Sequence, residues 1–179
     1  DIAQLGMDQR KVNVFAREIA PKLGYKKPVA VHHHMLLGLT QINSDAQGVD
    51  RAIEMKMSKS NPQSAIFMTD SEKDVQKKIN KAFCPEKQTE DNPVLDYARN
   101  IVFEKFKSFD IERPEKFGGN ISFDSYSELE TAFAKGTLHP ADLKQGTSKY
   151  INELLVPVRK HFEKNSKAKK LLKEVNLFS

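Results

Sequence analysis

A run of lysines and serines carries the side chains of this sequence that are best suited to phosphate chemistry. The run is Lys56-Met57-Ser58-Lys59-Ser60, and it lies in a long polar stretch without apolar periodicity. A loop of that length inside a compact domain is more often functional than idle. Two lysines on a loop that moves can reach a triphosphate and stabilise the charge that develops on departing pyrophosphate. The alternative is an exposed basic loop that binds nothing, since lysine–serine loops are common at protein surfaces.

A second candidate site lies near the start of the chain, at Gly6-Met7-Asp8-Gln9. A glycine at the end of a strand lets a ligand approach the backbone, and Asp8 can accept hydrogen bonds from ribose hydroxyls. Gln9 offers both a donor and an acceptor to a small zwitterion. The alternative is that Asp8 only caps the helix that follows it, because aspartate is a favoured capping residue.

The three consecutive histidines at 32–34 do not predict a metal site. Successive residues of a strand point to opposite faces, so the three rings cannot all bind one ion. No Cys or carboxylate lies near them at ligand spacing, and no metal is expected. The lone Cys84 excludes an intrachain disulfide, fits a reducing compartment, and is interpreted as a small core residue.

Two β-prone segments flank a helical pattern at the start of the chain. Residues 1–6 are typical of the end of a strand entering a glycine turn, and Val29–Val31 are typical of a short buried strand. Between them, four apolar residues share one helix face: Val12, Phe15, Ala16 and Ile19. A strand, a helix and a second strand within about thirty residues form the βαβ unit of an open α/β sheet.

After Asp70 the pattern changes to that of helices. Helix starts are expected at capping and proline signals: Ser71 with Asp74, Pro93, Ser125 with Glu128, His139-Pro140, and Ser166. The fold class expected is therefore an α/β part, residues 1–69, followed by an all-α part, residues 70–179.

The composition is that of a globular protein with a mild positive charge. Apolar residues make up 39% and charged residues 30%, which is too apolar for a disordered chain. Lys and Arg number 29 against 24 Asp and Glu, a net charge of +5. No apolar run approaches the roughly 18 residues of a membrane span, and no basic-then-apolar leader opens the chain. Neither membrane insertion nor secretion is expected.

The positive charge is concentrated near the C-terminal end. Between Arg159 and Lys173 there are seven Lys or Arg residues and one Glu. Such a run is usually a solvated helix face. It is also the kind of stripe that can neutralise the phosphates of a nucleic acid, and both interpretations stay open.

Several motifs, in their order and spacing, resemble those of one enzyme family. They are Gly-Met-Asp-Gln-Arg-Lys at 6–11, His-His-Met at 33–35, Gly-Leu at 38–39, the Lys-Met-Ser-Lys-Ser loop at 56–60, Asn-Pro-Gln-Ser-Ala-Ile-Phe-Met at 61–68, Lys-Ala-Phe-Cys-Pro at 81–85, Arg-Pro-Glu-Lys-Phe-Gly-Gly at 113–119 and Leu-His-Pro-Ala-Asp-Leu-Lys at 138–144. The chain resembles the tyrosyl-tRNA synthetases of archaeal and eukaryotic type over practically its whole length. The resemblance implies the C-terminal part of a Rossmann-like class I catalytic domain in residues 1–69 and a helical anticodon-binding domain in residues 70–179.

The resemblance also implies roles in binding ATP and tyrosine. Gly6 and Asp8 would sit at the ATP ribose, backbone groups of Met35 and Leu36 would meet the adenine, and Gln9 would hold the α-amino group of tyrosine. Four residues of the loop would act on the ATP phosphates, the lysines as the catalytic groups: Lys56, Ser58, Lys59 and Ser60.

In the helical part, the resemblance implies recognition of the tRNA anticodon. Phe117 would stack on the first anticodon base, and Asp142, with His139 at the same helix start, would hydrogen-bond the edge of that base. Cys84 would lie near the second base. Stacking combined with edge recognition is what readout of single-stranded RNA requires.

The implied activity is that of a tyrosine–tRNA ligase, which activates tyrosine with ATP and Mg²⁺ as substrate and transfers it to tRNA(Tyr). The His-Ile-Gly-His-type ATP motif and the tyrosine-hydroxyl pocket, which the family carries before this segment, are absent from the sequence. This chain alone is therefore not expected to activate tyrosine. The expected partners are tRNA(Tyr), ATP, tyrosine, the N-terminal half of the synthetase and a second copy of the intact enzyme. A cytoplasmic location, no membrane contact and no tightly bound cofactor are expected.

Two rival interpretations account for part of these motifs. A tryptophanyl-tRNA synthetase has a similar fold and loop, but Gly6-Met7-Asp8-Gln9 and the residues at 139–142 argue against it. A non-catalytic RNA-binding or signalling paralogue would keep the helical part, but it has no need of Lys56 and Lys59. An ATP motif in the residues that precede Asp1 would indicate an enzyme.

Overall fold

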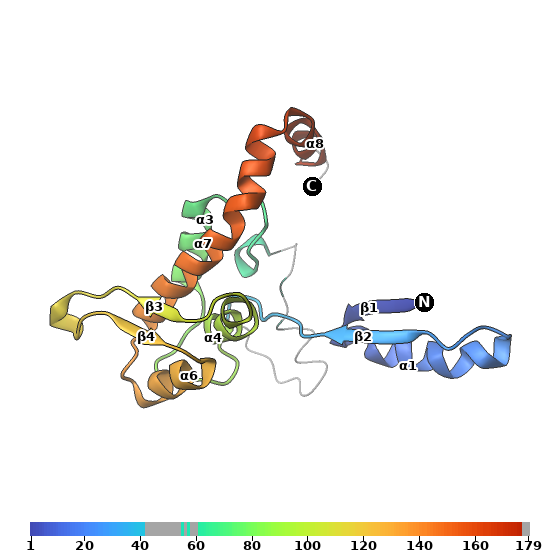
Figure 1. Cartoon of the computed structure of the whole chain (residues 1–179), viewed down its shortest axis with the longest axis horizontal. Helices are drawn as coiled ribbons and strands as arrows, with labels where there is room; N and C mark the ends of the chain where they lie inside the picture. The colour runs from blue at the N-terminus through green and yellow to red at the C-terminus, as the bar shows by residue number, and fades with distance from the viewer. Residues whose placement is uncertain (42–54, 56, 58–60, 177–179) are drawn as a thin grey trace. The chain divides into compact units, whose positions relative to one another are not determined.

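The computed structural model describes residues 1–41, 55, 57 and 61–176, and these residues form two compact units (Figure 1). The first contains Asp1–Leu37, and the second contains Gly38–Gln41 together with the described residues from Met57 onward. The predicted boundary near Thr69 separates a catalytic part from an anticodon-binding part. It does not describe compact units, and it stays a prediction.

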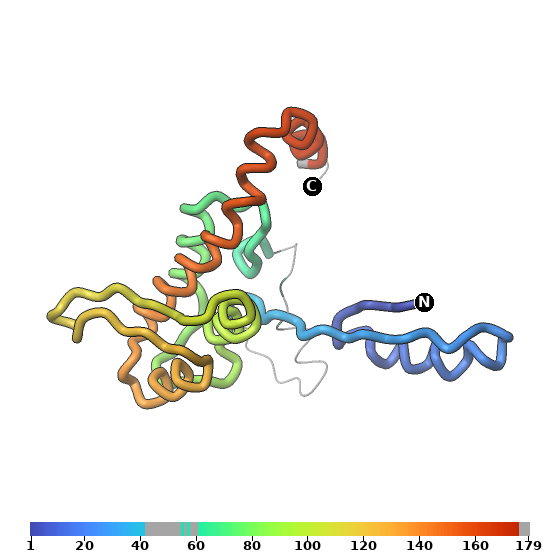
Figure 2. The backbone as a smooth tube through the Cα atoms, viewed as in Figure 1, coloured from blue at the N-terminus to red at the C-terminus, as the bar shows by residue number. Residues whose placement is uncertain are grey.

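The first unit is a strand–helix–strand segment, as the sequence predicts, and Figure 2 traces it as one continuous path. Its elements are β1 (Ile2–Gly6), the 3-10 turn η1 (Met7–Gln9), α1 (Arg10–Ile19), the 3-10 turn η2 (Ala20–Leu23) and β2 (Val29–His33). The two strands are parallel, with Ile2 opposite Val29 and Gly6 opposite His33. The βαβ prediction is confirmed, and the second strand extends two residues beyond the predicted Val31. The predicted burial of this strand is not observed, since Val29 and Val31 are 55% and 45% exposed.

The apolar side chains of this first unit lie largely exposed. Val12 and Phe15, on the face that periodicity selects for burial, are 61% and 62% exposed. Within residues 1–37, Asn13 is the one residue classed as buried. The apolar residues of α1 therefore do share one face, but none of the described residues covers that face.

The second unit is mostly helical and has a core of its own. Its elements are η3 (Pro62–Ser64), α3 (Glu72–Lys81), α4 (Pro93–Tyr97), the π-helical segment η4 (Ala98–Val102), α5 (Phe103–Lys105), β3 (Phe109–Ile111), η5 (Glu115–Phe117), β4 (Ile121–Phe123), α6 (Tyr126–Lys135), α7 (Pro140–Lys164) and α8 (Ser166–Asn176). None of the helices in the described part of the chain is long and apolar enough to cross a membrane.

The predicted capping signals mostly begin helices. Ser71 Oγ accepts from the Asp74 amide at 3.2 Å, and Ser125 Oγ accepts from the Glu128 amide at 3.3 Å. The last helix begins at Ser166 as predicted, but Ser166 is not its capping residue. Asn165 Oδ1, rather than Ser166, accepts from the Ala168 amide at 3.0 Å, because the helix already begins at Ser166 and the capping side chain must precede it.

The all-α prediction for residues 70–179 is also wrong in one place. β3 and β4 form an antiparallel pair, with Phe109 opposite Phe123 and Ile111 opposite Ile121. Each strand has only three residues, too few for alternation to stand out in the sequence. The pair is stabilised by tertiary packing, since Phe109 and Ile111 are buried against the rest of the unit.

Helix α7 forms the centre of this core. It packs against α3, and Gly146 lets it approach β3 closely. A Cβ atom at Gly146 would lie 2.5 Å from Phe109 Cε1 and 3.2 Å from Ile111 Cγ1. Phe109 and Tyr150 then stack obliquely, with ring centroids 5.1 Å apart.

Candidate active site and nucleic-acid interface

The carboxyl ends of β1 and β2 bring together three of the residues predicted to bind ATP. A Cβ atom at Gly6 would lie 2.8 Å from Asp8 Oδ1 and 3.3 Å from Met35 Cγ. Glycine at this position therefore allows the Asp8 carboxylate and the Met35 side chain to lie against the backbone. In open α/β sheets, ligands bind outside the carboxyl ends of the strands, which is where this cluster lies.

Asp8 lies at the start of α1 without being its N-cap residue. Helix α1 begins at Arg10, its N-cap residue is Gln9, and that cap makes no side-chain hydrogen bond to the helix. Asp8 lies one residue earlier, inside the turn η1, and is half-buried. Gln9 is exposed beside it, and Leu36 continues the half-buried segment that follows β2.

The histidines of β2 make local contacts. His32 Nε2 lies 3.0 Å from Asn13 Nδ2 of α1, and His33 Nδ1 lies 3.2 Å from the carbonyl oxygen of His34. Among the described residues, no group of three His, Cys, Asp or Glu side chains is placed to hold a metal ion. The His32–Asn13 contact links the helix to the strand beneath it.

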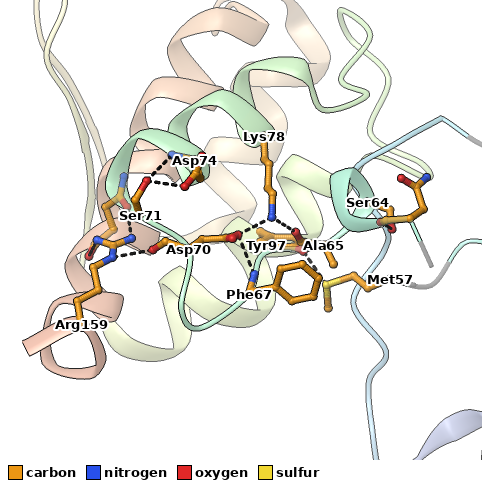
Figure 3. Close-up of polar contacts among 12 residues, drawn as sticks. Met57, Ser64, Ala65, Phe67, Asp70, Ser71, Asp74, Lys78, Tyr97 and Arg159 are labelled. Atoms are coloured by element: carbon orange, nitrogen blue, oxygen red, sulfur yellow. Dashed lines mark hydrogen bonds and ion pairs between the residues drawn. The ribbon is translucent and has the colours of Figure 1, made fainter. Parts of the chain in front are cut away.

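Within the Lys-Met-Ser-Lys-Ser run, Met57 is the residue that the structure describes; Lys56, Ser58, Lys59 and Ser60 lie outside the described residues. Met57 is half-buried, and its sulfur accepts a hydrogen bond from the Tyr97 hydroxyl at 3.0 Å (Figure 3). Tyr97 comes from α4 and is only 2% exposed. Burial raises the pKa of Tyr97, so its hydroxyl keeps the proton that it donates.

The two ends of the polar stretch around this run lie together. The amide of Leu39 donates to the carbonyl oxygen of Ser64 at 2.9 Å. The carbonyl oxygen of Leu39 in turn accepts from the amide of Phe83, just after α3, at 2.7 Å. Leu39 and Ser64 are 1% and 3% exposed, so the base of the stretch belongs to the core of the second unit.

The predicted anticodon residue Phe117 is presented to solvent. It ends η5, between β3 and β4, and is 62% exposed. Gly118 and Gly119 follow with φ of 94° and 69°, a backbone region that favours glycine. The Lys116 ammonium lies 4.9 Å from the Phe117 ring centroid. An exposed ring next to a cation suits stacking on a base near a phosphate backbone.

His139 and Asp142 lie together at the start of α7. His139 Nδ1 accepts from the Ala141 amide at 3.1 Å, so the imidazole caps the helix, while Asp142 lies in the first turn. Arg113 contacts this turn through its Nη1 atom, 3.5 Å from Asp142 Oδ2. The same guanidinium donates from Nε to the carbonyl oxygen of Gly119 at 2.9 Å. Arg113 therefore connects the segment of Phe117 to the helix of Asp142.

Cys84, the remaining anticodon candidate, has a more buried environment. It is 9% exposed, and the Asn92 side chain donates to its sulfur at 3.4 Å. Burial raises the pKa of the thiol, which keeps it protonated at neutral pH. Its predicted place near the second anticodon base stays a prediction.

Two residues that sequence reasoning missed are Arg113 and Lys78. Arg113 lies inside one of the quoted motifs, at 113–119, but nothing in the sequence names its partner Asp142. Lys78 is buried on α3 and pairs with Asp70 at 2.6 Å. The sequence contained a signal for this burial. A lysine three residues after Val75 and next to Ile79 falls on the apolar stripe of the helix.

Comparison with known proteins decides the family. The family model of "tRNA synthetases class I (W and Y)" matches residues 1–156. The chain belongs to this class I synthetase family. The resemblance to tyrosyl-tRNA synthetase is confirmed, because this class I chain is 46% identical over 191 residues to the tyrosine–tRNA ligase of Thermococcus kodakarensis. It is also 48% identical over 176 residues to the cytoplasmic tyrosine–tRNA ligase 2 of Arabidopsis thaliana.

Solved structures of the family agree. The tyrosyl-tRNA synthetase of Pyrococcus horikoshii, crystallised with L-tyrosine, superposes with a TM-score of 0.87 at 42% identity, over 97% of this chain and 51% of that one. The Thermococcus alignment covers 98% of this chain and 51% of its relative, whereas the Arabidopsis alignment covers 98% and 22%. This class I synthetase chain thus spans about half the length of the archaeal relatives that it matches.

The basic stripe of this synthetase chain is exposed along the end of α7 and along α8. Its six lysines are Lys160, Lys164, Lys167, Lys169, Lys170 and Lys173, and all are exposed. Lys170 lies 3.9 Å from Glu174, one turn further along α8. This exposure fits both interpretations of the stripe, and its contact with nucleic acid remains a prediction.

Proposed function

We propose that the chain is part of a tyrosine–tRNA ligase, which activates tyrosine with ATP and transfers the tyrosyl group to tRNA(Tyr). The observation that carries the proposal is the match to tyrosine–tRNA ligases over 98% of the chain. In the first step the tyrosine carboxylate attacks the α-phosphorus of ATP and pyrophosphate leaves. In the second step a ribose hydroxyl at the 3′ end of the tRNA attacks the activated carbonyl and AMP leaves.

The residues of the first step are assigned as follows. Gly6 and Asp8 bind the ribose, Met35 and Leu36 lie at the adenine, and Gln9 holds the amino group of tyrosine. Lys56 and Lys59 stabilise the charge on the departing pyrophosphate, while Ser58 and Ser60 shape the loop. The approach of Asp8 and Met35 to Gly6 supports the ribose and adenine assignments. Mg²⁺ enters with ATP as part of the substrate.

Residues 70–179 are proposed to form the anticodon-binding domain, and residues 1–69 to belong to the catalytic domain. Phe117 stacks on the first anticodon base and Asp142 accepts a hydrogen bond from its edge, with His139 fixing the helix start and Cys84 near the second base. The Arg113 link between Gly119 and Asp142 supports a common site, because it holds the two elements in one arrangement.

The exposed apolar residues of the first unit support a further partner, the N-terminal half of the synthetase. β1 and β2 form a two-stranded parallel sheet, and Ile2, Val29 and Val31 on these strands are 73%, 55% and 45% exposed. Parallel sheets are normally covered on both faces. Further strands and helices of the same catalytic domain would cover these residues. A homodimer is proposed for the intact enzyme.

The proposal is tested on the loop lysines of the full-length synthetase. Lys56→Ala and Lys59→Ala are each expected to lower the maximal rate of ATP–pyrophosphate exchange by about 100-fold, the usual effect of losing one charge-stabilising group. The affinity for tyrosine should stay near the wild-type value, because the charges matter when pyrophosphate departs. Lys73→Ala, at an exposed site of α3, is the matched control. Wild-type rates in both loop variants would exclude the assignment, and tRNA binding without any exchange would favour the non-catalytic paralogue.

A further inference from the structure

Lys78 lies on the apolar face of α3, where an apolar residue is expected. Its neighbours on the same stripe, Val75, Ile79 and Ala82, are 0%, 1% and 4% exposed, and Lys78 itself is 7% exposed. Lysines are almost never buried to this extent unless the ammonium group is paired. The partners of Lys78 therefore indicate its role.

In the part of the chain that the structure describes, the partners of the Lys78 ammonium all lie in one short segment, residues 65–70. Nζ donates to Asp70 Oδ2 at 2.6 Å and to the carbonyl oxygen of Ala65 at 3.0 Å. It also lies 4.5 Å from the centroid of the Phe67 ring. Figure 3 shows Lys78 pointing from α3 toward Ala65 and Asp70. One ammonium group thus fixes both ends of the segment and the ring between them.

Asp70 is held from three directions. Its Oδ2 atom accepts from the Phe67 amide at 2.9 Å as well as from Lys78. Its carbonyl oxygen accepts from Arg159 Nε of α7 at 2.9 Å. The segment is therefore tied to α3 and α7 together, and it starts next to Ser64, which pairs with Leu39 at the base of the loop.

The segment lies a short distance after the Lys-Met-Ser-Lys-Ser run in the chain. Ala65 comes five residues after Ser60, a distance that the backbone spans in at most about 18 Å. The one described residue of the run, Met57, is held by Tyr97 of α4 in the same compact unit. The helical unit therefore contacts the run at Met57 and again just beyond it.

Stability alone does not account for a charge at this position. A buried ion pair gains little over a hydrophobic pair of similar volume, because both ions lose their water. A leucine or methionine would fill the stripe of α3 equally well. The ammonium group has several N–H donors, so it can fix the positions of several neighbouring groups at once.

We propose that Lys78 is a positioning residue, which fixes Ala65–Asp70 and thereby the place of Met57 in the Lys-Met-Ser-Lys-Ser run. Its effect on tyrosine activation is indirect, through the run whose lysines act on pyrophosphate. The inference rests on the proposed function for its effect on rate, whereas its effect on Met57 can be measured on the chain by itself.

The first measurement uses the 179-residue chain labelled with ¹³C at the methionine methyl groups. The Met57 signal is assigned with Met57→Leu. Lys78→Met removes the charge and leaves an unbranched apolar side chain one atom shorter. Asp70→Asn removes the partner charge, and Lys77→Met, exposed on the same helix, is the matched control. The Met57 methyl signal should shift or broaden in the first two variants and stay unchanged in the control.

The second measurement is ATP–pyrophosphate exchange in the full-length synthetase. Lys78→Met is expected to lower the maximal rate by about 10- to 100-fold, the scale of a small misplacement of catalytic groups. The KM for tyrosine should change less than about twofold, since none of the described partners of Lys78, which all lie in residues 65–70, is assigned to tyrosine binding. The double variant Lys78→Met/Asp70→Asn leaves no unpaired charge, so its Tm should recover relative to Lys78→Met while its exchange rate stays low.

The outcomes separate the two proposals. A wild-type synthetase without exchange activity would refute the proposed function, and the Met57 signal would still test Lys78. An unchanged Met57 signal in both Lys78→Met and Asp70→Asn would overturn the positioning role, whatever the enzyme does. Recovery of both Tm and exchange rate in the double variant would also overturn it, because Lys78 would then only stabilise the fold. If Lys78→Met does not fold, Asp70→Asn provides the same comparison.

Discussion

Arg113 and Asp142 form an ion pair that connects the segment between β3 and β4 to the first turn of α7. The Nη1 to Oδ2 distance is 3.5 Å, and the two side chains are 10% and 21% exposed. Because Arg113 also binds the carbonyl oxygen of Gly119, its guanidinium sets the distance between the Phe117 segment and Asp142. The proposed base-stacking and base-edge groups thus depend on one shared residue.

The first prediction concerns Asp142. In the full-length synthetase, Asp142→Ala should weaken charging of tRNA(Tyr) and leave pyrophosphate exchange intact. The expected loss is about 1–3 kcal/mol of discrimination at the first anticodon base, the scale of a good hydrogen-bonded base contact. Phe117→Ala should share this phenotype, because stacking on a base is worth about 1–3 kcal/mol. The measurement is aminoacylation of transcripts altered at that base.

A control is needed because Asp142→Ala leaves Arg113 without its ion-pair partner. The double variant Arg113→Gln/Asp142→Ala removes that charge, so its Tm should recover relative to the single variant while base discrimination stays lost. If the single and double variants still prefer the native base as strongly as wild type does, Asp142 acts only in the helix start.

The second prediction concerns the close approach of α7 and β3. Gly146→Ala should destabilise the chain by about 1–3 kcal/mol, because the new methyl group would overlap the Phe109 ring and crowd Ile111. This loss exceeds the gain in helix propensity, which is about 1 kcal/mol for replacing glycine. Urea unfolding measures it, with Gln145→Ala on the exposed side of the same helix as control. A more stable Gly146→Ala variant would show that α7 and β3 can move apart to admit the methyl group.

The third prediction concerns pH. Hydrogen bonds from Ser122 and Ser108, at 2.6 and 3.0 Å, keep the pKa of Asp110 below its ordinary value. Because the folded pKa lies below the unfolded one, this stabilisation is present above about pH 4 and is lost as the pH falls through the lower folded value. Asp110→Asn should therefore show a smaller loss of stability on acidification than wild type.

The measurement is the urea midpoint at about pH 5 and about pH 2.5, on either side of the carboxylate titration. Asp124→Asn removes the same charge at an exposed position just after β4, and it should retain the wild-type acid dependence. Equal acid dependence in Asp110→Asn and wild type would show that the serine contacts do not favour the ionised form.

The fourth prediction concerns Cys84. Its burial and raised pKa should make the native thiol react with a disulfide reagent at least about 100-fold more slowly than the thiol of the urea-unfolded chain. The reaction at about pH 8, near the pKa of a free thiol, is followed by absorbance. Rapid stoichiometric reaction of the native chain would mean that the segment around Asn92 opens readily.

Local signals in the sequence predict much of the fold. Ser71 with Asp74 and Ser125 with Glu128 begin helices as expected, because a capping box is complete within four residues. The strands β1 and β2 follow from apolar runs bounded by Gly6 and Pro28. At these positions the interactions that determine the structure join residues close together in the sequence, so the sequence pattern is enough to predict them.

The elements that sequence reasoning missed depend on distant partners. β3 packs against α7 and β4 against α6, and both strands are too short to show a period. Arg113 finds Asp142 twenty-nine residues away, and Lys78 binds a segment that precedes its own helix. The residue types were visible in each case, but only the folded chain shows which groups they pair with.

The hydrogen bond between Leu39 and Ser64 has a consequence for how the chain can change in length. Since Leu39 and Ser64 already meet in the core, the loop-closure entropy of the chain between them grows by only about 0.6 kcal/mol for each doubling of its length. Insertions and deletions at this place should therefore be tolerated better than in α3 or α7.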